Sequence, residues 1–164
     1  MQKEKSIDHA LRATWQAVAK TYNEQAAKHQ STMAMAMALL YIDQEMGTPS
    51  TSLGPSMGME ATSLSRTLKS MEEKGLICRE RNPQDGRGVF IKLTDLGKEK
   101  REISKASVYK FNQAIRDHID EVKIDHFFEV TEMINQLIQE KAIFEDQPPA
   151  NTNYNKQLDE KKTH

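Results

Sequence analysis

Residues 61–71 combine hydroxyl and cationic side chains at helical spacing. Because an α-helix turns by about 100° per residue, Ala61, Leu64, Leu68 and Met71 fall on one apolar face. The open face then carries Thr62, Ser63, Ser65, Arg66, Lys69 and Ser70. Arginine hydrogen-bonds guanine through two donors, and small hydroxyl groups reach bases or phosphates without blocking approach. The pattern is typical of a helix that reads the DNA major groove, although an ordinary helix with a solvated outer face has the same pattern.

A basic β-hairpin is predicted directly after this helix. Gly75 ends the helix, residues 76–78 begin a strand, and residues 89–93 return with alternating apolar side chains. The segment between them, residues 82–88, is rich in turn-forming residues. A basic loop of this kind can place an arginine in a narrow minor groove, and a surface turn with solvated charges is the alternative. The candidate DNA-contacting residues of the hairpin are Arg79, Arg81, Asp85, Arg87 and Lys92, with Asp85 orienting the Arg87 guanidinium.

Two motifs in this region resemble the MarR (multiple antibiotic resistance regulator) family. The run Asp85-x-Arg87-x5-Leu93-Thr94-x2-Gly97 is similar to the wing signature of that family. The run Leu64-Ser65-Arg66-x-Leu68, followed by Glu72-Glu73-Lys74-Gly75-Leu76-Ile77, is similar to its recognition helix and the exit into the wing. The resemblance covers residues 48–100 by motif and extends by helix pattern to about residue 144. It implies a winged helix-turn-helix dimer on pseudo-palindromic operators, usually a repressor released by a small ligand or by oxidation.

The first helix of the helix-turn-helix departs from the family pattern. The sequence has Gly54 and Pro55 where an alanine-rich helix is usual, and both residues lower helix propensity. We therefore expect a short helix, from about Leu53 to Met57, that contributes little to phosphate contacts.

The predicted fold is mainly α with a small β-hairpin wing (α+β). Its parts are N-terminal helices in residues 1–46, a winged helix-turn-helix lobe in 47–97, C-terminal dimerisation helices in 98–144 and a disordered tail in 145–164. Helices are expected at 6–29, 32–46, 95–119 and 124–143. The terminal helices carry apolar stripes that the small lobe cannot bury alone, so pairing with a second copy is predicted.

The resemblance also implies a ligand crevice between the dimerisation helices and the lobe. The candidate crevice residues are Trp15, Tyr22, Met33 and Met37. Methionine surfaces adapt to varied ligands. Helical Met and aromatic stripes are nevertheless also explained as ordinary core.

Charge and composition restrict the function further. The net charge is −1, but residues 60–94 hold seven Lys/Arg against five Asp/Glu, so any DNA affinity must be local. No run approaches the length of an apolar membrane span and no signal peptide is evident, which predicts a cytoplasmic protein. The single Cys78 lies in an apolar run, which favours a buried structural thiol over a redox sensor.

No arrangement of residues indicates an enzyme or a cofactor. The five His are scattered, and no zinc spacing or phosphate-binding loop is present. His118 and His126 are at most a hypothetical zinc pair at a dimer interface. The sequence predicts a homodimeric, DNA-binding transcriptional repressor modulated by a small ligand. The alternative is a winged-helix module that binds protein instead of DNA.

Overall fold

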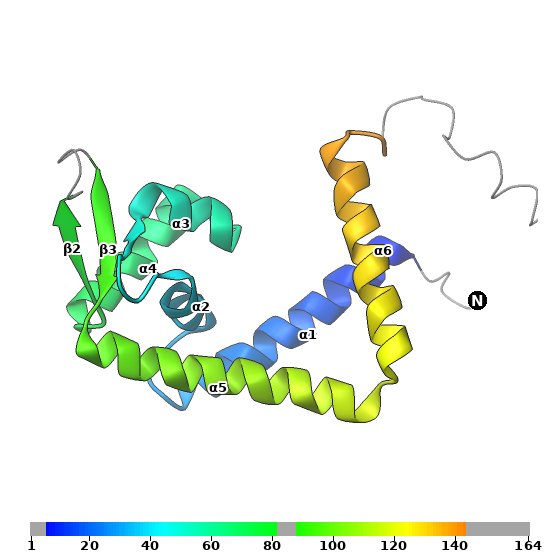
Figure 1. Cartoon of the computed structure of the whole chain (residues 1–164), viewed down its shortest axis with the longest axis horizontal. Helices are drawn as coiled ribbons and strands as arrows, with labels where there is room; N and C mark the ends of the chain where they lie inside the picture. The colour runs from blue at the N-terminus through cyan, green and yellow to red at the C-terminus, as the bar shows by residue number, and fades with distance from the viewer. Residues whose placement is uncertain (1–5, 82–87, 144–164) are drawn as a thin grey trace, which may run out of the picture. The chain divides into compact units, whose positions relative to one another are not determined.

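The computed structural model describes residues 6–81 and 88–143. Within them, the chain is mainly helical and carries one small antiparallel sheet, which confirms the predicted fold class (Figure 1). The chain divides into two compact units at residue 114, inside a long helix. The first unit holds the sheet and the helices around it.

The first two helices are α1 (Ile7–Ala27) and α2 (Met33–Tyr41). Thr32 caps α2, because its hydroxyl accepts a hydrogen bond from the Met35 N–H at 3.2 Å. The prediction that α2 continues to residue 46 was wrong. Ile42 adopts an extended backbone, and the Asp43 carboxylate then accepts the N–H groups of Glu45 and Met46 in a turn. An aspartate that bonds backbone groups two and three residues ahead favours a turn over a helix.

The helix-turn-helix consists of α3 (Ser50–Met57) and α4 (Ala61–Glu73). Helix α3 is longer than predicted and contains Pro55. A proline removes one helical hydrogen bond, and the carbonyl that loses its donor belongs to Thr51, which is exposed to solvent. Gly58 ends α3 with a φ of 62°, a left-handed conformation that glycine adopts without a steric penalty. Gly54 is buried, and a Cβ atom there would lie 3.2 Å from the Met59 carbonyl oxygen.

The sheet has three strands in the order β1-β3-β2. The hairpin strands β2 (Ile77–Arg81) and β3 (Val89–Leu93) pair antiparallel, with Cys78 opposite Lys92. Strand β1 (Thr48–Pro49) was not predicted from the sequence. A strand of two residues has no periodicity to detect. Its pairing with Phe90 and Ile91 of β3 places the segment before the helix-turn-helix against the wing.

The core of this unit lies between α2, α3, α4 and the sheet. Its most deeply buried large side chains are Leu39, Ile42, Leu53, Met71 and Ile91. Helix α4 contributes Leu64, Leu68 and Met71 as predicted, whereas Ala61 is exposed at its first turn. The apolar stripe therefore fixes which face of α4 points outward.

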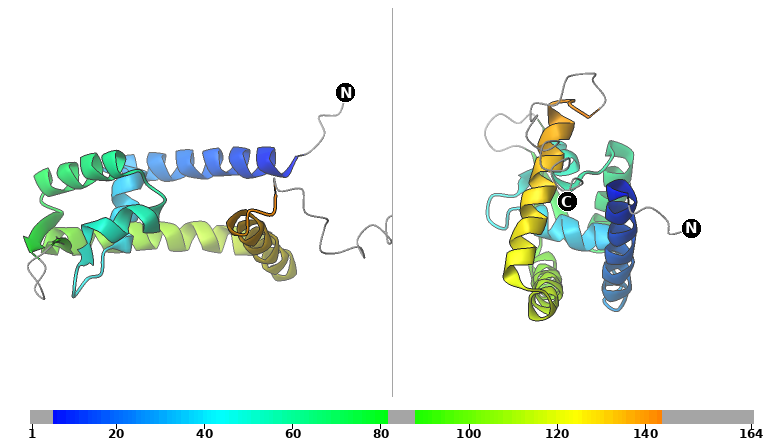
Figure 2. Two further views of the ribbon diagram at one scale, coloured as in Figure 1. Left: turned by 90° about the horizontal axis from the view of Figure 1, so that it is seen from above. Right: turned by 90° about the vertical axis from the view of Figure 1, so that its right-hand side faces the viewer.

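Helix α5 (Asp95–His118) begins immediately after the wing. Thr94 caps it: its hydroxyl accepts the Gly97 N–H at 3.0 Å and donates to the Gly75 carbonyl at 2.6 Å. Gly97 is buried against the wing, and a Cβ atom there would lie 1.9 Å from the Leu76 carbonyl oxygen. Both α1 and α5 extend away from the sheet (Figure 2), and they meet where the Tyr22 and Phe111 rings lie 5.2 Å apart.

The second unit contains the end of α5 and helix α6 (Glu121–Gln139). Asp120 caps α6 by accepting the Val122 N–H at 3.0 Å, so the helix starts three residues earlier than predicted. None of the described helices is long and apolar enough to cross a membrane.

Candidate nucleic-acid interface

The open face of α4 carries the side chains expected to contact DNA. Thr62, Ser63, Ser65, Arg66 and Lys69 are exposed, and Ser70 is half-buried. Within the described part of the chain, no acidic side chain is paired with Arg66. Lys69 lies 4.0 Å from Glu73, one turn along the helix, and both side chains are well exposed. An exposed pair of this kind contributes little energy. Both cations can therefore reach an anionic partner.

The base of the wing is held to α4 by an ion pair. The Arg79 Nε atom lies 3.0 Å from the Glu72 carboxylate, which joins β2 to the last turn of α4. The Lys92 Nζ atom lies 2.7 Å from the Glu80 carboxylate on the neighbouring strand. Two of the predicted wing contacts, Arg79 and Lys92, thus have carboxylate partners that the sequence analysis did not assign. These pairs orient the hairpin on the helix and reduce its net positive charge.

The outer part of the wing holds the remaining candidates. Arg81 is exposed at the last position of β2. Asp85 and Arg87 lie outside the described residues. The structure therefore brings Arg66, Lys69, Arg79 and Lys92 onto one helix and its adjoining hairpin.

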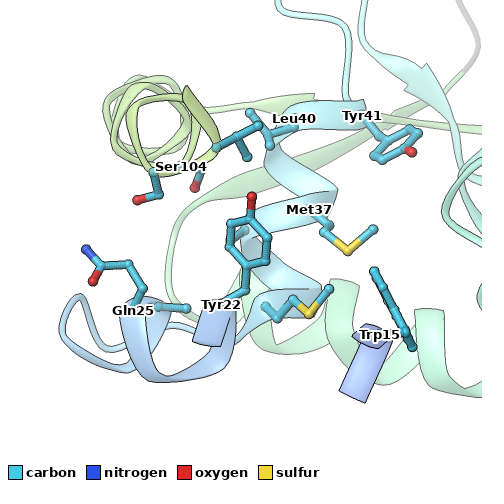
Figure 3. Close-up of a pocket in the computed structure, with 12 residues that line it drawn as sticks. Trp15, Tyr22, Gln25, Met37, Leu40, Tyr41 and Ser104 are labelled. Atoms are coloured by element: carbon cyan, nitrogen blue, oxygen red, sulfur yellow. The ribbon is translucent and has the colours of Figure 1, made fainter. Parts of the chain in front are cut away.

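The four predicted crevice residues line one cavity of about 270 Å³. Trp15 and Tyr22 come from α1, and Met33 and Met37 come from α2. Figure 3 shows their common space, with Leu40, Tyr41 and Ser104 around it. The wall that α5 supplies through Ser104, Ser107 and Val108 was not predicted from the sequence. Their spacing in the sequence indicates that they share one face of a helix. The sequence does not indicate that this face lies opposite α2.

This cavity is apolar and uncharged. No Asp, Glu, Lys, Arg or His lines it among the residues that the structure describes. The hydroxyls of Ser104 and Ser107 donate to carbonyls of their own helix at 3.1 and 3.0 Å. Burial raises the pKa of the Tyr22 phenol further above neutrality, so the phenol adds no charge to the cavity. The cavity suits an uncharged, largely apolar group.

Two further expectations concern cysteine and metals. Cys78 is half-buried rather than buried, because it follows the buried Ile77 on β2 and its side chain therefore faces the other side of the sheet. His118 has its Nδ1 atom 2.8 Å from the Ala114 carbonyl oxygen. In the described ranges, no three His, Cys, Asp or Glu side chains gather as metal ligands, so His118 and His126 have no third partner there.

The comparisons with known proteins agree on this region. The model of the MarR family matches residues 32–89, from the cap of α2 to the first residue of β3. Residues 32–89 form a MarR-family domain. The chain is 33% identical over 75 residues to the HTH-type transcriptional regulator YdgJ of Bacillus subtilis (strain 168), a match that covers 46% of this chain and 44% of that protein. The aligned segment thus spans less than half of that relative.

Solved structures extend the likeness beyond the MarR domain. The MepR–DNA complex of S. aureus superposes with a TM-score of 0.74 at 20% identity, covering 82% of this chain and 100% of that chain. CouR from Rhodococcus jostii RHA1 bound to p-coumaroyl-CoA gives 0.72 at 20% identity, covering 82% and 95%. At these identities the likeness shows the fold. MarR-family proteins and the curated relative are transcription regulators, not enzymes.

Proposed function

We propose that this protein is a sequence-specific DNA-binding transcriptional regulator, acting as a homodimeric repressor that a small ligand modulates. The observation that carries the proposal is the open face of α4. There Arg66 stands exposed among small hydroxyl side chains, inside a MarR domain. Among the described residues Arg66 has no carboxylate partner, so its guanidinium can donate two hydrogen bonds to a guanine edge.

The sites of contact follow from this arrangement. Helix α4 would enter the major groove, with Arg66 at base edges and Thr62, Ser63, Ser65, Lys69 and Ser70 at bases or phosphates. The wing would follow the phosphate backbone and the adjacent minor groove through Arg81 and Arg87, with Asp85 orienting Arg87. Arg79 and Lys92 would act mainly by orienting the hairpin, since each already binds a carboxylate.

Dimerisation is supported by apolar side chains that the chain leaves exposed. Helix α1 exposes Ile7, Leu11 and Trp15 at intervals of four residues. Helix α6 exposes a larger set: Val122, Phe127, Phe128, Val130, Met133, Leu137 and Ile138. Apolar surface of this extent marks an interaction site. A second copy with two-fold symmetry would cover it and would place two recognition helices about 34 Å apart on DNA.

Ligand control is supported by the apolar cavity lined by Trp15, Tyr22, Met33 and Met37. The cavity is lined by α1, α2 and α5, so an occupant contacts two helices outside the MarR domain and one inside it. The related CouR structure holds p-coumaroyl-CoA. The compared relatives are bacterial, and operator binding would place the protein in the cytoplasm, where bacterial chromosomal DNA lies.

The first test is the substitution Arg66→Ala. We expect it to weaken binding to operator DNA by about 1–3 kcal/mol and to relax base preference, because a bidentate base contact is lost. The measurement is a mobility shift on the promoter region next to the protein's own coding sequence, compared with random DNA. Arg12→Ala is the matched control, since Arg12 is an exposed arginine on α1 outside the MarR domain. Wild-type affinity of Arg66→Ala for both DNAs would refute the assignment.

A second candidate function is a winged-helix module that binds protein rather than DNA. The net charge of −1 and the carboxylate partners of Arg79 and Lys92 favour it. A salt titration of the same mobility shift separates the two functions. If the protein is a DNA-binding regulator, we expect a mobility shift and an affinity that falls steeply with salt. If it is a protein-interaction module, we expect no mobility shift even at low salt.

A further inference from the structure

The end of α4 is bonded both to the turn after α1 and to the cap of α5. The Lys74 ammonium donates a hydrogen bond to the Gln30 carbonyl at 2.8 Å, across 44 positions of the sequence. Gln30 lies in the turn that follows α1. The carbonyl of the next residue, Gly75, accepts a hydrogen bond from the Thr94 hydroxyl at 2.6 Å, and Thr94 caps α5. Two adjacent residues thus connect α4 to both of the long helices that leave the lobe.

The carbonyl that Lys74 binds is held in place by the turn around it. Gln30 has a φ of 55°, a left-handed conformation that is unfavourable for a residue with a side chain. The Gln30 N–H donates to the Ala27 carbonyl at 3.0 Å, and the Ser31 N–H donates to the Ala26 carbonyl at 3.1 Å. Because these bonds fix the backbone on both sides of Gln30, its carbonyl has a defined direction.

The backbone of Lys74 is fixed in the same way, as the cap of α4. Its N–H donates to the Ser70 carbonyl at 3.1 Å. The neighbouring carboxylates of Glu72 and Glu73 are paired with other cations, and no acidic side chain in the described ranges is ion-paired with Lys74. The ammonium is therefore left to the Gln30 carbonyl, and a hydrogen bond from a charged donor is stronger than one between neutral groups.

A bond at this place controls the direction of α4. A rotation of about 10° about Lys74 would displace the far end of α4 by about 3 Å, because 13 helical residues span about 20 Å. That displacement is close to one base-pair step of about 3.4 Å. We propose that Lys74 is a positioning residue for DNA binding, which braces α4 against the end of α1 through the Gln30 carbonyl. In the proposed dimer, on which this inference rests, the brace sets the distance between the two α4 helices.

An incidental surface contact is the competing explanation, because Lys74 is exposed and many exposed lysine contacts contribute little. Two observations favour a positioning role. Both ends of the bond are held by turns that end helices, and the adjacent Gly75 carbonyl is bonded to Thr94. Removal of the ammonium should therefore loosen the attachment of the lobe to α1 without unfolding either part.

Spin labels on α4 measure the distance between the two lobes of a dimer directly. Ala61 is exposed at the start of α4 and Cys78 is the single cysteine of the chain, so Ala61→Cys with Cys78→Ser carries one label per protomer. Electron–electron double resonance on the full chain without DNA then gives the label-to-label distance. In this background we expect a narrow distribution with Lys74 and one at least twice as wide with Lys74→Met, at unchanged helical circular dichroism. Lys74→Met keeps the apolar stem and removes the donors.

Two further variants test the cause of the broadening. Lys74→Arg should restore the narrow distribution, because a guanidinium also donates to a carbonyl. Lys105→Met removes the same charge from an exposed position of α5 and should leave the width unchanged. Equal widths with Lys74 and with Lys74→Met would overturn the inference. If the protein with Lys74 intact gave no label-to-label distance, the proposed dimer itself would fail, and this role of Lys74 with it.

DNA binding gives a second readout. We expect Lys74→Met to weaken binding to the promoter region next to the protein's own coding sequence about three- to tenfold, because two half-sites must be met at a set spacing. Its affinity for random DNA should equal that of Lys105→Met, because non-specific binding follows charge alone. A similar loss on both DNAs, or a similar loss in both variants, would assign the effect to charge and contradict the positioning role.

Discussion

Gly97 lies where the start of α5 packs tightly against the segment that leads into the wing. Its N–H donates to the Thr94 hydroxyl, and a Cβ atom would lie 1.9 Å from the Leu76 carbonyl oxygen, which already accepts the Thr94 N–H at 3.1 Å. A methyl group there requires α5 or the wing to move. We expect Gly97→Ala to lower the free energy of unfolding by about 1–3 kcal/mol, as overpacked sites do.

Chemical denaturation monitored by helical circular dichroism measures this change. Lys98→Ala is the matched control, because Lys98 is exposed on the same turn of α5. Its effect should stay within about 0.5 kcal/mol. If Gly97→Ala were as stable as Lys98→Ala, the wing would move away from the added methyl group without a loss of free energy of unfolding, and the prediction would be wrong.

Asp43 links stability to pH. Hydrogen bonds from the Met46 and Glu45 N–H groups hold the pKa of its carboxyl below the ordinary value of 3.8, and nearby Arg101 lowers it further. A lowered folded-state pKa means that the stabilisation is complete above about pH 4 and is lost as the pH falls through the folded-state value. We therefore expect wild type to lose stability relative to Asp43→Asn on acidification below pH 4. Parallel denaturation curves from pH 6 to pH 3 measure the difference. A constant difference across that range would contradict the role of the carboxylate.

At the scale of elements, Glu72 sets the electrostatics between α4 and the wing. It pairs with Arg79, so its charge offsets one cation next to the proposed DNA-binding face. We expect Glu72→Gln to tighten binding to random DNA several-fold and to steepen its salt dependence, because Arg79 gains freedom to bind phosphate. The control is Glu99→Gln, which changes the net charge equally at an exposed position of α5. A similar gain in both variants would assign the effect to net charge alone.

Some of the helices and strands could be predicted from the sequence and others could not. Helix α4 and the hairpin strands were predicted because each has a strong local signal, an apolar stripe in the helix and alternating apolar side chains in the strands. Strand β1 was missed because it forms only by pairing with β3, which is distant in the sequence. The early end of α2 was missed because the Asp43 turn depends on hydrogen bonds of one side chain, which leave no periodic pattern. The carboxylate partners of Arg79 and Lys92 were missed for the same reason, because only the folded register brings them together.

At the scale of the whole molecule, the exposed apolar face of α6 gives a direct test of dimerisation. Val130 is 52% exposed. We expect Val130→Glu to shift the protein from dimer to monomer in sedimentation measurements, because a carboxylate would be buried in the proposed interface. Gln136→Glu introduces the same charge at an exposed polar position of α6 and should leave the dimer intact. A wild-type protein that is monomeric at micromolar concentration would contradict the proposed dimer.

Strand β1 precedes the helix-turn-helix in the chain, and its partner β3 follows it. During synthesis, Thr48 and Pro49 are added to the chain well before Phe90 and Ile91, so the sheet cannot close early. In the folded protein, Leu53 and Met71 are fully buried in a core that includes side chains of β2 and β3. Until those strands are made, this part of the core is missing. Contacts between distant parts of a chain form late in folding. The lobe should therefore acquire its structure in one step after Leu93 emerges, rather than helix by helix as it is translated.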